Sequence, residues 1–283
     1  MCDECAVRTV DLHFTYPDGT RALRGVNFTA RRGEKVAIIG SNGSGKSTFL
    51  FHLNGILFPT KGKVFINGEE ITKKNLDNIR QTVGIVFQDP DDQLFAPTVW
   101  DDVAFGPGNM GLSKSEVEER VNNTLKMLNI EQLKDRSPDN LSGGQKRLVS
   151  IAGVLAMNPE IIALDEPTSN LDSRSSSTVM RLLHNLSARM KITLIMATHD
   201  IDAVPLFAER VYVMSEGRII AEGTPEDVFS DVEAIRNSHL RLPRVAHMME
   251  ILHKKDGMPT GNPYPLTIGE ARRRLREICG LRN

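Results

Sequence analysis

A lysine and two hydroxyl residues follow a glycine-rich segment near the start of the chain. The segment Gly40–Thr48 reads GSNGSGKST and matches the pattern G-x4-G-K-[ST]. Glycines let backbone N–H groups turn inward around phosphate oxygens, and a helix start adds partial positive charge. Lys46 would reach the β- and γ-phosphates, and Ser47 would bind Mg²⁺. The predicted phosphate-binding residues are Gly40, Ser41, Asn42, Gly43, Ser44, Gly45, Lys46, Ser47 and Thr48.

Two adjacent carboxylates follow the apolar run Ile161–Leu164. An acid at the end of a buried strand beside a phosphate loop can hold Mg²⁺, and this is the role predicted for Asp165. Glu166 is then placed to polarise an attacking water as a general base. A strand that ends in Asp-Glu is weak evidence alone, and the phosphate loop upstream makes it strong.

A third segment, Leu141–Gln145, reads LSGGQ and opens a predicted helix. Ser142, Gly143, Gly144 and Gln145 would expose backbone donors there, which predicts a second anion-binding site. The alternative interpretation is an ordinary helix-capping loop. One phosphate loop does not need such a second site within the same chain.

The elements that must position these side chains are strands of two kinds. Alternating apolar residues predict half-buried antiparallel strands, whereas continuous apolar runs predict strands covered on both faces, as in a parallel sheet flanked by helices. The alternating stretches are Val10–Tyr16, Val26–Ala30 and Val64–Ile66, and the continuous runs are Val36–Ile39, Val83–Phe87, Ile161–Leu164 and Ile192–Ala197. Val211–Met214 and Arg218–Ala221 predict a hairpin.

Predicted helices fill the spaces between the strands. Ser113–Asn129 opens with a capping box, and Gln145–Met157 stops at Asn-Pro. Arg244–Lys255 and Thr267–Cys279 form a small C-terminal appendage. The fold class is therefore α/β, with an N-terminal antiparallel part. The predicted domains are 1–238, with a helical insert at about 90–157, and 239–283.

Composition excludes some classes of protein. The net charge of −1 over 283 residues gives no steering field for nucleic acid, so no nucleic-acid partner is expected. Three cysteines do not make a disulfide framework, and Cys2 and Cys5 are interpreted as terminal thiols rather than half of a metal or redox site. No apolar run approaches the roughly 20 residues that span a bilayer, and no secretory signal opens the sequence.

The order of phosphate loop, LSGGQ and strand-Asp-Glu resembles the ABC ATPase family over residues 7–235. The resemblance implies a P-loop NTPase fold that uses ATP and Mg²⁺. It also implies that Tyr16 stacks on adenine, that Gln88 touches Mg²⁺ and water, and that His199 contacts the γ-phosphate. Ser169–Asp172 matches the loop that crosses to a second ATPase subunit, identical or paralogous. Asn170 departs from the usual small residue there, but asparagine tolerates the left-handed conformation.

Two stretches are similar to energy-coupling-factor importers, whose ATPases sit peripherally at the cytoplasmic face of the cell membrane. Val86–Pro107 resembles their docking region for a transmembrane energy-coupling subunit, which works with a substrate-binding membrane subunit. Leu240–His247 and Thr267–Arg272 resemble cobalt-transport ATPase subunits, so cobalt or nickel is the expected cargo. A vitamin importer and a soluble non-transport ABC ATPase are the alternatives.

Two charged clusters leave alternatives open. Asp89, Asp91 and Asp92 are interpreted as a solvated turn or docking rim, with a metal site as the alternative. The run Arg272–Arg276 is interpreted as a solvated helix face with partner contact, with binding to anionic lipid as the alternative.

Overall fold

The computed structural model describes residues 5–238 and 240–280. The alternating strands form one sheet of order β2-β1-β4-β5. It is built from β1 (Cys5–Thr15), β2 (Arg21–Arg31), β4 (Lys61–Ile66) and β5 (Glu69–Glu70). All its neighbouring pairs are antiparallel, which confirms the prediction from alternation. Tyr16 comes directly after β1 and so lies at the end of this sheet.

The continuous apolar runs form a second sheet of order β10-β9-β3-β8-β7-β6. Its strands are β3 (Lys35–Ile39), β6 (Val83–Val86), β7 (Ile161–Asp165), β8 (Thr193–Thr198), β9 (Arg210–Ser215) and β10 (Arg218–Gly223). β6, β7, β8, β3 and β9 run parallel, and β9 and β10 form the predicted hairpin. The carboxyl ends of the central strands therefore meet at one edge.

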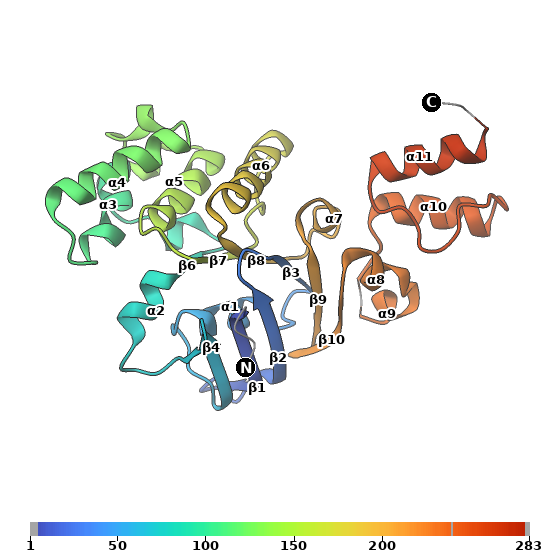
Figure 1. Ribbon diagram of the computed structural model, residues 1–283, viewed down its shortest axis with the longest axis horizontal. Helices are drawn as coiled ribbons and strands as arrows, with labels where there is room; N and C mark the ends of the chain where they lie inside the picture. Colours follow the sequence, from blue (N-terminus) through green and yellow to red (C-terminus); the bar gives the residue numbers. More distant parts are fainter. Residues whose placement is uncertain (1–4, 239, 281–283) are drawn as a thin grey trace.

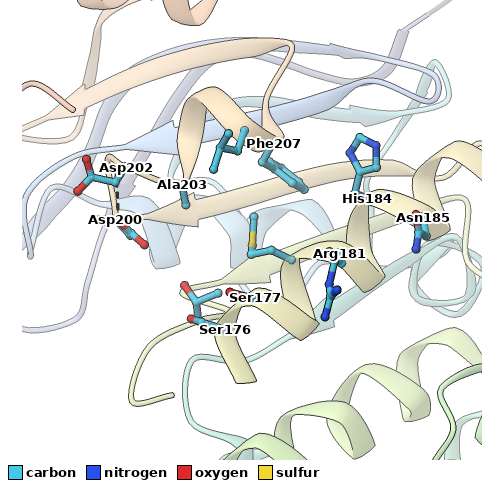
Figure 2. Close-up of a pocket in the computed structure, with 12 residues that line it drawn as sticks. Ser176, Ser177, Arg181, His184, Asn185, Asp200, Asp202, Ala203 and Phe207 are labelled. Carbon is cyan, nitrogen blue, oxygen red and sulfur yellow. Dashed lines mark hydrogen bonds between the residues drawn. The ribbon is translucent and has the colours of Figure 1, made fainter. Parts of the chain in front are cut away.

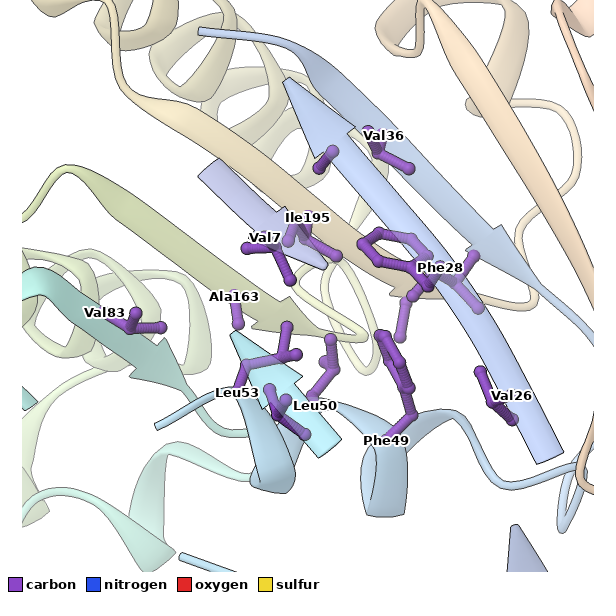
Figure 3. Packing of buried hydrophobic residues seen from close by; sticks show 14 of the residues in the cluster. Val7, Val26, Phe28, Val36, Phe49, Leu50, Leu53, Val83, Ala163 and Ile195 are labelled. Atoms are coloured by element: carbon purple, nitrogen blue, oxygen red, sulfur yellow. The ribbon is translucent and has the colours of Figure 1, made fainter. Parts of the chain in front are cut away.

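Helix α1 (Lys46–Leu53) lies between the two sheets. Its buried side chains Phe49, Leu50 and Leu53 pack in one cluster with side chains from both sheets, as Figure 3 shows. Phe49 meets Phe28 of β2 edge-on, with 4.9 Å between ring centroids. Because α1 starts inside the phosphate loop, this core fixes where the loop lies.

The opposite face of the parallel sheet is covered by helices of a second apolar cluster. α2 (Leu76–Thr82) precedes β6. The helical insert holds α3 (Val99–Gly108), α4 (Lys114–Met127) and α5 (Gly143–Leu155), with short 3-10 turns at Pro90–Asp92, Glu131–Leu133 and Pro138–Asn140. α6 (Ser173–Met190) completes the layer. The helix predicted from its capping box is confirmed as α4. α5 begins two residues before the predicted Gln145, because Ser142 caps it.

Of the helices that follow α6, the first lies next to α6 and the others lie on the far side of the molecule from the insert (Figure 1). They are α7 (Val204–Phe207), α8 (Pro225–Ser230), α9 (Val232–Asn237), α10 (Arg244–Lys254) and α11 (Ile268–Ile278). Both predicted C-terminal helices are confirmed. Ala246, Met249 and Ala271 share a buried cluster with Ala37 of β3, so the appendage is docked on the ATPase core. The predicted boundary at residue 239 stays a prediction, because residue 239 lies outside the described residues, as does Cys2.

Among residues 5–238 and 240–280, no helix is both long enough and apolar enough to cross a bilayer.

Candidate functional site

The phosphate loop needs glycine at the residue directly before α1. Gly45 adopts φ of 106°, a left-handed conformation, and a side chain there would lie 2.7 Å from the Ala22 carbonyl oxygen. Lys46 is almost completely buried and folds back over its own loop. Its ammonium donates to the carbonyl oxygens of Gly40 at 2.9 Å and Ser41 at 3.1 Å. Phosphate oxygens would be stronger, charge-assisted acceptors for the same ammonium.

Asp165 ends β7 beside the loop, with 2% of its surface exposed. Burial raises the pKa of this carboxyl, and a hydrogen bond from the Ser47 hydroxyl partly opposes that effect. Its Oδ1 atom has no hydrogen-bond partner within the described chain. A buried carboxylate oxygen without a partner is rare in folded proteins and requires an explanation.

Glu166 is held in one orientation by the end of the neighbouring strand. Its Oε2 atom accepts from the Thr198 hydroxyl and the His199 backbone N–H, both at 3.2 Å. Its Oε1 atom lies 2.8 Å from His199 Nδ1 and 4.0 Å from Lys46 Nζ. Glu166 also has a positive φ of 46°, a conformation uncommon for residues other than glycine. Backbone and side-chain contacts therefore both aim this carboxylate at the phosphate loop.

Tyr16 is joined to the phosphate loop from the other sheet. Its hydroxyl lies 3.0 Å from the Thr48 hydroxyl, and its ring meets Phe14 edge-on at 4.8 Å. Phe14 in turn packs against the buried ring of His52 on α1, with 4.9 Å between centroids. The aromatic residue predicted to stack on adenine thus lies next to the predicted phosphate site.

Gln88 follows β6, and its backbone carbonyl accepts from the Arg147 guanidinium at 2.5 Å. The acidic residues that come next are already engaged. The Asp89 side chain caps the 3-10 turn by accepting from Asp91 N–H, and Asp91 pairs with Lys146 at 2.5 Å. The described residues hold no group of three or more His, Cys, Asp or Glu side chains placed to share a metal ion. Asp89 and Asp91 thus serve in capping and ion pairing, as expected for the solvated turn or docking rim predicted for this acidic run.

The LSGGQ segment caps its own helix. The Gln145 side chain accepts from Ser142 N–H at 3.0 Å, and the Ser142 hydroxyl accepts from Gln145 N–H at 3.4 Å. Ser142 and Gly143 remain exposed. The capping box therefore satisfies the backbone N–H groups of Ser142 and Gln145, while the first turn of the helix stays open to solvent.

The predicted crossing loop lies beside this helix start. Asn170 adopts a left-handed φ of 59°, the conformation that asparagine was expected to tolerate there. Asp172 caps α6 by accepting from the Arg174 and Ser175 backbone N–H groups. A cleft of about 240 Å³ is lined by residues of three segments, among them Gln88, Gly143 and Asn170.

The predicted site residues fall into two groups in space. Lys46, Asp165, Glu166 and His199 are linked to one another, with Tyr16 attached through Thr48. Ser142 to Gln145 form the second group, and within the described residues no hydrogen bond or ion pair joins them to Gly40–Thr48.

One buried side chain of this region was not predicted. Arg147 is 1% exposed and contacts the Gln88 segment. A signal existed in the sequence, because Arg147, Ile151 and Val154 share one helix face, and a cation among apolar residues there is unusual.

A cavity of about 630 Å³ lies elsewhere, between α6 and α7 (Figure 2). Apolar side chains such as Met180 and Phe207 line it together with Arg181 and His184. It contains none of the residues predicted to bind nucleotide.

The donor atoms beside the phosphate loop fit Mg²⁺. This ion prefers oxygen ligands and is usually held by one or two carboxylates together with substrate phosphates. Asp165 offers an unpartnered carboxylate oxygen next to the Ser47 hydroxyl, and Gln88, two residues after the adjacent strand β6, carries an amide oxygen.

Comparison with known proteins agrees with this geometry. The profile of the family described as "ABC transporter" matches residues 23–169. A putative ABC transporter ATP-binding protein of Methanothermobacter marburgensis is 57% identical, over 96% of this chain and 98% of that protein. The energy-coupling factor transporter ATP-binding protein EcfA of Methanocaldococcus jannaschii is 56% identical, over 96% of this chain and 99% of that protein.

Two solved structures are also similar. CbiO1 from Clostridium perfringens, described as part of the ABC transporter complex cbiONQ, is 48% identical with a TM-score of 0.75, covering 88% of this chain and 100% of that one. The ATP-binding cassette MJ0796, a dimer in a post-hydrolysis state bound to ADP and Pi, is 33% identical with a TM-score of 0.70, covering 77% and 98%.

The burial of Asp165 predicts a pH-dependent effect on stability. Because burial raises the pKa of this carboxyl, the folded state binds the proton more tightly than the unfolded chain, and ionisation opposes folding above the folded pKa. Asp165→Asn should therefore raise the thermal midpoint of the nucleotide-free protein at pH 8, where each 1 kcal/mol corresponds to about 2–4 °C. The gain should disappear towards about pH 4, where aspartate itself is protonated.

Calorimetry from pH 4 to pH 8 without Mg²⁺ measures this effect. Asp11→Asn is the matched control, because hydrogen bonds from Lys61 and His13 lower the pKa of that exposed carboxyl and no gain is expected. A lower midpoint of Asp165→Asn at pH 8 would contradict the burial argument.

Proposed function

The chain belongs to the ABC transporter family as an ATP-binding subunit of the energy-coupling-factor type, and on that premise we propose that two such subunits bind ATP between them. Hydrolysis of that ATP drives transport. Each nucleotide lies between the phosphate loop of one subunit and the LSGGQ segment of the other, in a head-to-tail pair.

The observation that carries this proposal is the separation of the two groups of site residues. The phosphate-loop group is internally connected, whereas the first turn of α5 faces solvent without contact to it. The backbone N–H groups at an exposed helix start can bind a phosphate, but this helix start lies apart from the phosphate loop of its own chain. A second chain supplies that ligand, bound in its own phosphate loop. The dimeric, ADP- and Pi-bound form of the similar cassette MJ0796 supports the same arrangement.

Each residue beside the phosphate loop has a proposed task. Lys46 and the backbone N–H groups of the loop hold the phosphates, and Tyr16 holds the adenine by stacking. Ser47, Asp165 and Gln88 would hold Mg²⁺, which neutralises developing negative charge on the phosphates when it is bound. His199 contacts the γ-phosphate from its exposed position beside Glu166.

Glu166 is proposed as the general base that accepts a proton from the attacking water. Its carboxylate is nearly buried, and the bonds from Thr198 and His199 fix its direction. A base pre-oriented in this way needs little reorganisation when the proton moves. Closing the pair would exclude bulk water from the same place.

We also propose that the subunit binds peripherally to the cytoplasmic face of the membrane, against a transmembrane energy-coupling subunit that works with a substrate-binding membrane subunit. Phe95 and Phe105 support this docking site, because their side chains are 68% and 55% exposed and pack edge-on at 4.9 Å. An exposed aromatic pair beside the Gln88 segment is suited to receive a partner helix. The C-terminal appendage, residues 239–283, is proposed to help hold the ATPase pair together.

The proposed cargo is cobalt or nickel, on the resemblance of Leu240–His247 and Thr267–Arg272 to cobalt-transport subunits. A vitamin is the alternative cargo.

Mixing two inactive variants tests the shared site. Lys46→Ala removes the phosphate lysine, and Gly143→Asp places a carboxylate where phosphate must approach. The second change should fold, because a side chain at residue 143 meets only Leu171, at 3.9 Å, and a helix start favours negative charge. Half of randomly mixed dimers hold one intact site of two, so we expect up to about one quarter of the wild-type rate.

Each variant alone should be inactive, and Gly143→Asp should bind ATP as a monomer with unchanged affinity. Gly143→Ala is the control and should keep most of the activity. A mixture no more active than its parts, or a strictly monomeric wild type with full activity per molecule, would refute the shared site.

Glu166→Gln tests the general base. The amide keeps the hydrogen-bonding shape but cannot accept a proton, so kcat should fall about 10²–10⁴-fold while ATP still binds. Single-turnover hydrolysis and equilibrium ATP binding measure the two effects separately. If Glu166→Gln hydrolyses ATP at the wild-type rate, Glu166 is not the general base.

Isolation of the intact complex tests the membrane partner and the cargo. Detergent extracts of the source membranes should yield this chain with hydrophobic subunits, and Phe95→Asp should lose them while retaining the ATPase activity of the isolated chain. Leu206→Asp is the control, because Leu206 is 70% exposed on a different face. An extract without any hydrophobic partner would refute the transport role, and cobalt uptake by the reconstituted complex would decide the cargo.

A further inference from the structure

Arg147 is a buried cation without an acidic partner. It lies on α5, five residues after the cap Ser142, with 1% of its surface exposed. No carboxylate of the described residues forms an ion pair with it, and its Nε atom has no hydrogen-bond partner there. Burial lowers the pKa of the guanidinium, and only the more distant charges of Asp89 and Asp165 oppose this. An arginine nevertheless remains protonated in proteins.

Packing alone does not explain this side chain. Arg147 lies on the same helix face as Ile151 and Val154, both buried. A buried charge is costly, and apolar residues of similar volume often replace such groups without loss of stability. What the guanidinium adds is therefore its hydrogen bonds.

These bonds hold both peptide groups that flank Gln88. One terminal nitrogen donates to the Phe87 carbonyl and the other to the Gln88 carbonyl, each at 2.5 Å. The first carbonyl belongs to the peptide before the Gln88 Cα atom and the second to the peptide after it. Fixing both peptide planes fixes φ and ψ of Gln88, and hence the direction in which its side chain leaves the backbone. The planar guanidinium presents its two terminal nitrogens in a fixed geometry, so it holds the two acceptors in a defined orientation relative to each other.

The same arginine belongs to the helix that starts at the LSGGQ segment. The cleft of about 240 Å³ brings together Gln88, Gly143, Arg147 and Asn170. A rotation or shift of α5 therefore moves the guanidinium and the exposed helix start together. Arg147 thus transmits the position of α5 to the peptides on either side of Gln88.

Other contacts keep the two segments attached without Arg147. The Gln93 side chain accepts from Phe87 N–H at 3.1 Å and donates to the Ser150 carbonyl of α5 at 3.0 Å. Lys146 pairs with Asp91. Loss of Arg147 should therefore leave the fold in place while it frees the orientation of Gln88.

We propose that Arg147 is a positioning residue for ATP hydrolysis, which sets the orientation of Gln88 through the two flanking carbonyls and couples it to the movement of the LSGGQ helix. The inference rests on the role proposed above for Gln88. It assigns to Arg147 no contact with the nucleotide.

The test compares Arg147→Met, Arg147→Lys, Gln88→Ala and the double variant Gln88→Ala/Arg147→Met in the full-length chain. A misplacement of about 1 Å can cost about 100-fold in rate, so Arg147→Met should lower kcat at least ~10-fold. Its affinity for ATP, measured by fluorescent-nucleotide titration, should stay within about twofold, since Arg147 touches no nucleotide. Arg147→Lys keeps the charge but not the fork and should have an intermediate kcat.

The decisive readout is the double variant. If Arg147 acts through Gln88, Arg147→Met should have no further effect on kcat once Gln88 is alanine, because residues that act as a unit are not additive. Arg120→Met is the control, since Arg120 also donates to a backbone carbonyl, but to that of Met157 and not to those of Phe87 or Gln88. That variant should keep the wild-type kcat.

Three results would overturn the proposal: wild-type kcat in Arg147→Met, independent multiplication of the two effects, or loss of ATP affinity in parallel with kcat. If Arg147→Met fails to fold, a wild-type kcat in Arg147→Lys would overturn it equally. If one of these results is found while the wild type is active and Gln88→Ala is inactive, the role of Arg147 is refuted but the proposed function is not. An inactive wild-type pair would remove the proposed function and this inference together.

Discussion

The rest of the structure must accommodate two adjacent buried carboxylates that lie close to one lysine. Asp165 ends β7 and Glu166 follows it, with 2% and 5% exposure, and the Lys46 ammonium lies 4.0 Å from the Glu166 carboxylate. Such a cluster is stable only where neighbouring groups orient each charge. Thr198 and His199 do this for Glu166, whereas one oxygen of Asp165 is left without a protein partner. The fold thus keeps a buried acceptor oxygen in place, where the proposed function puts the Mg²⁺ that accompanies the nucleotide.

The sheet order explains how distant segments supply this cluster. β3 lies beside β8 and β8 beside β7, all parallel, so residues that follow these strands meet at one edge. α1 is clamped between the two sheets by Phe49 and its neighbours, which fixes the phosphate loop against that edge. Burial of apolar side chains in the core therefore offsets the desolvation cost of burying the charged groups of the site.

The second half of the proposed composite site is positioned by a different layer of the fold. α5 packs on the opposite face of the parallel sheet, and its capped start stays exposed. Contacts from Arg147, Lys146 and Gln93 tie this helix to the segment after β6. The surface proposed to face a second subunit and the segment proposed to face the membrane partner therefore belong to one connected unit, through which ATP binding would be coupled mechanically to the transporter in the proposed function.

The sequence by itself determined the local chemistry. The glycines of the phosphate loop, the strand that ends in Asp165-Glu166 and the capping boxes of α4 and α11 are patterns of neighbouring residues, so they were predictable. Only the tertiary structure decided what depends on contacts across the chain: the partners of Glu166, the bond between Tyr16 and Thr48, and the grip of Arg147 on two carbonyls 59 and 60 residues away. The number of residues between two segments does not give the distance between them in space, because strands and helices far apart in the sequence come together only on folding.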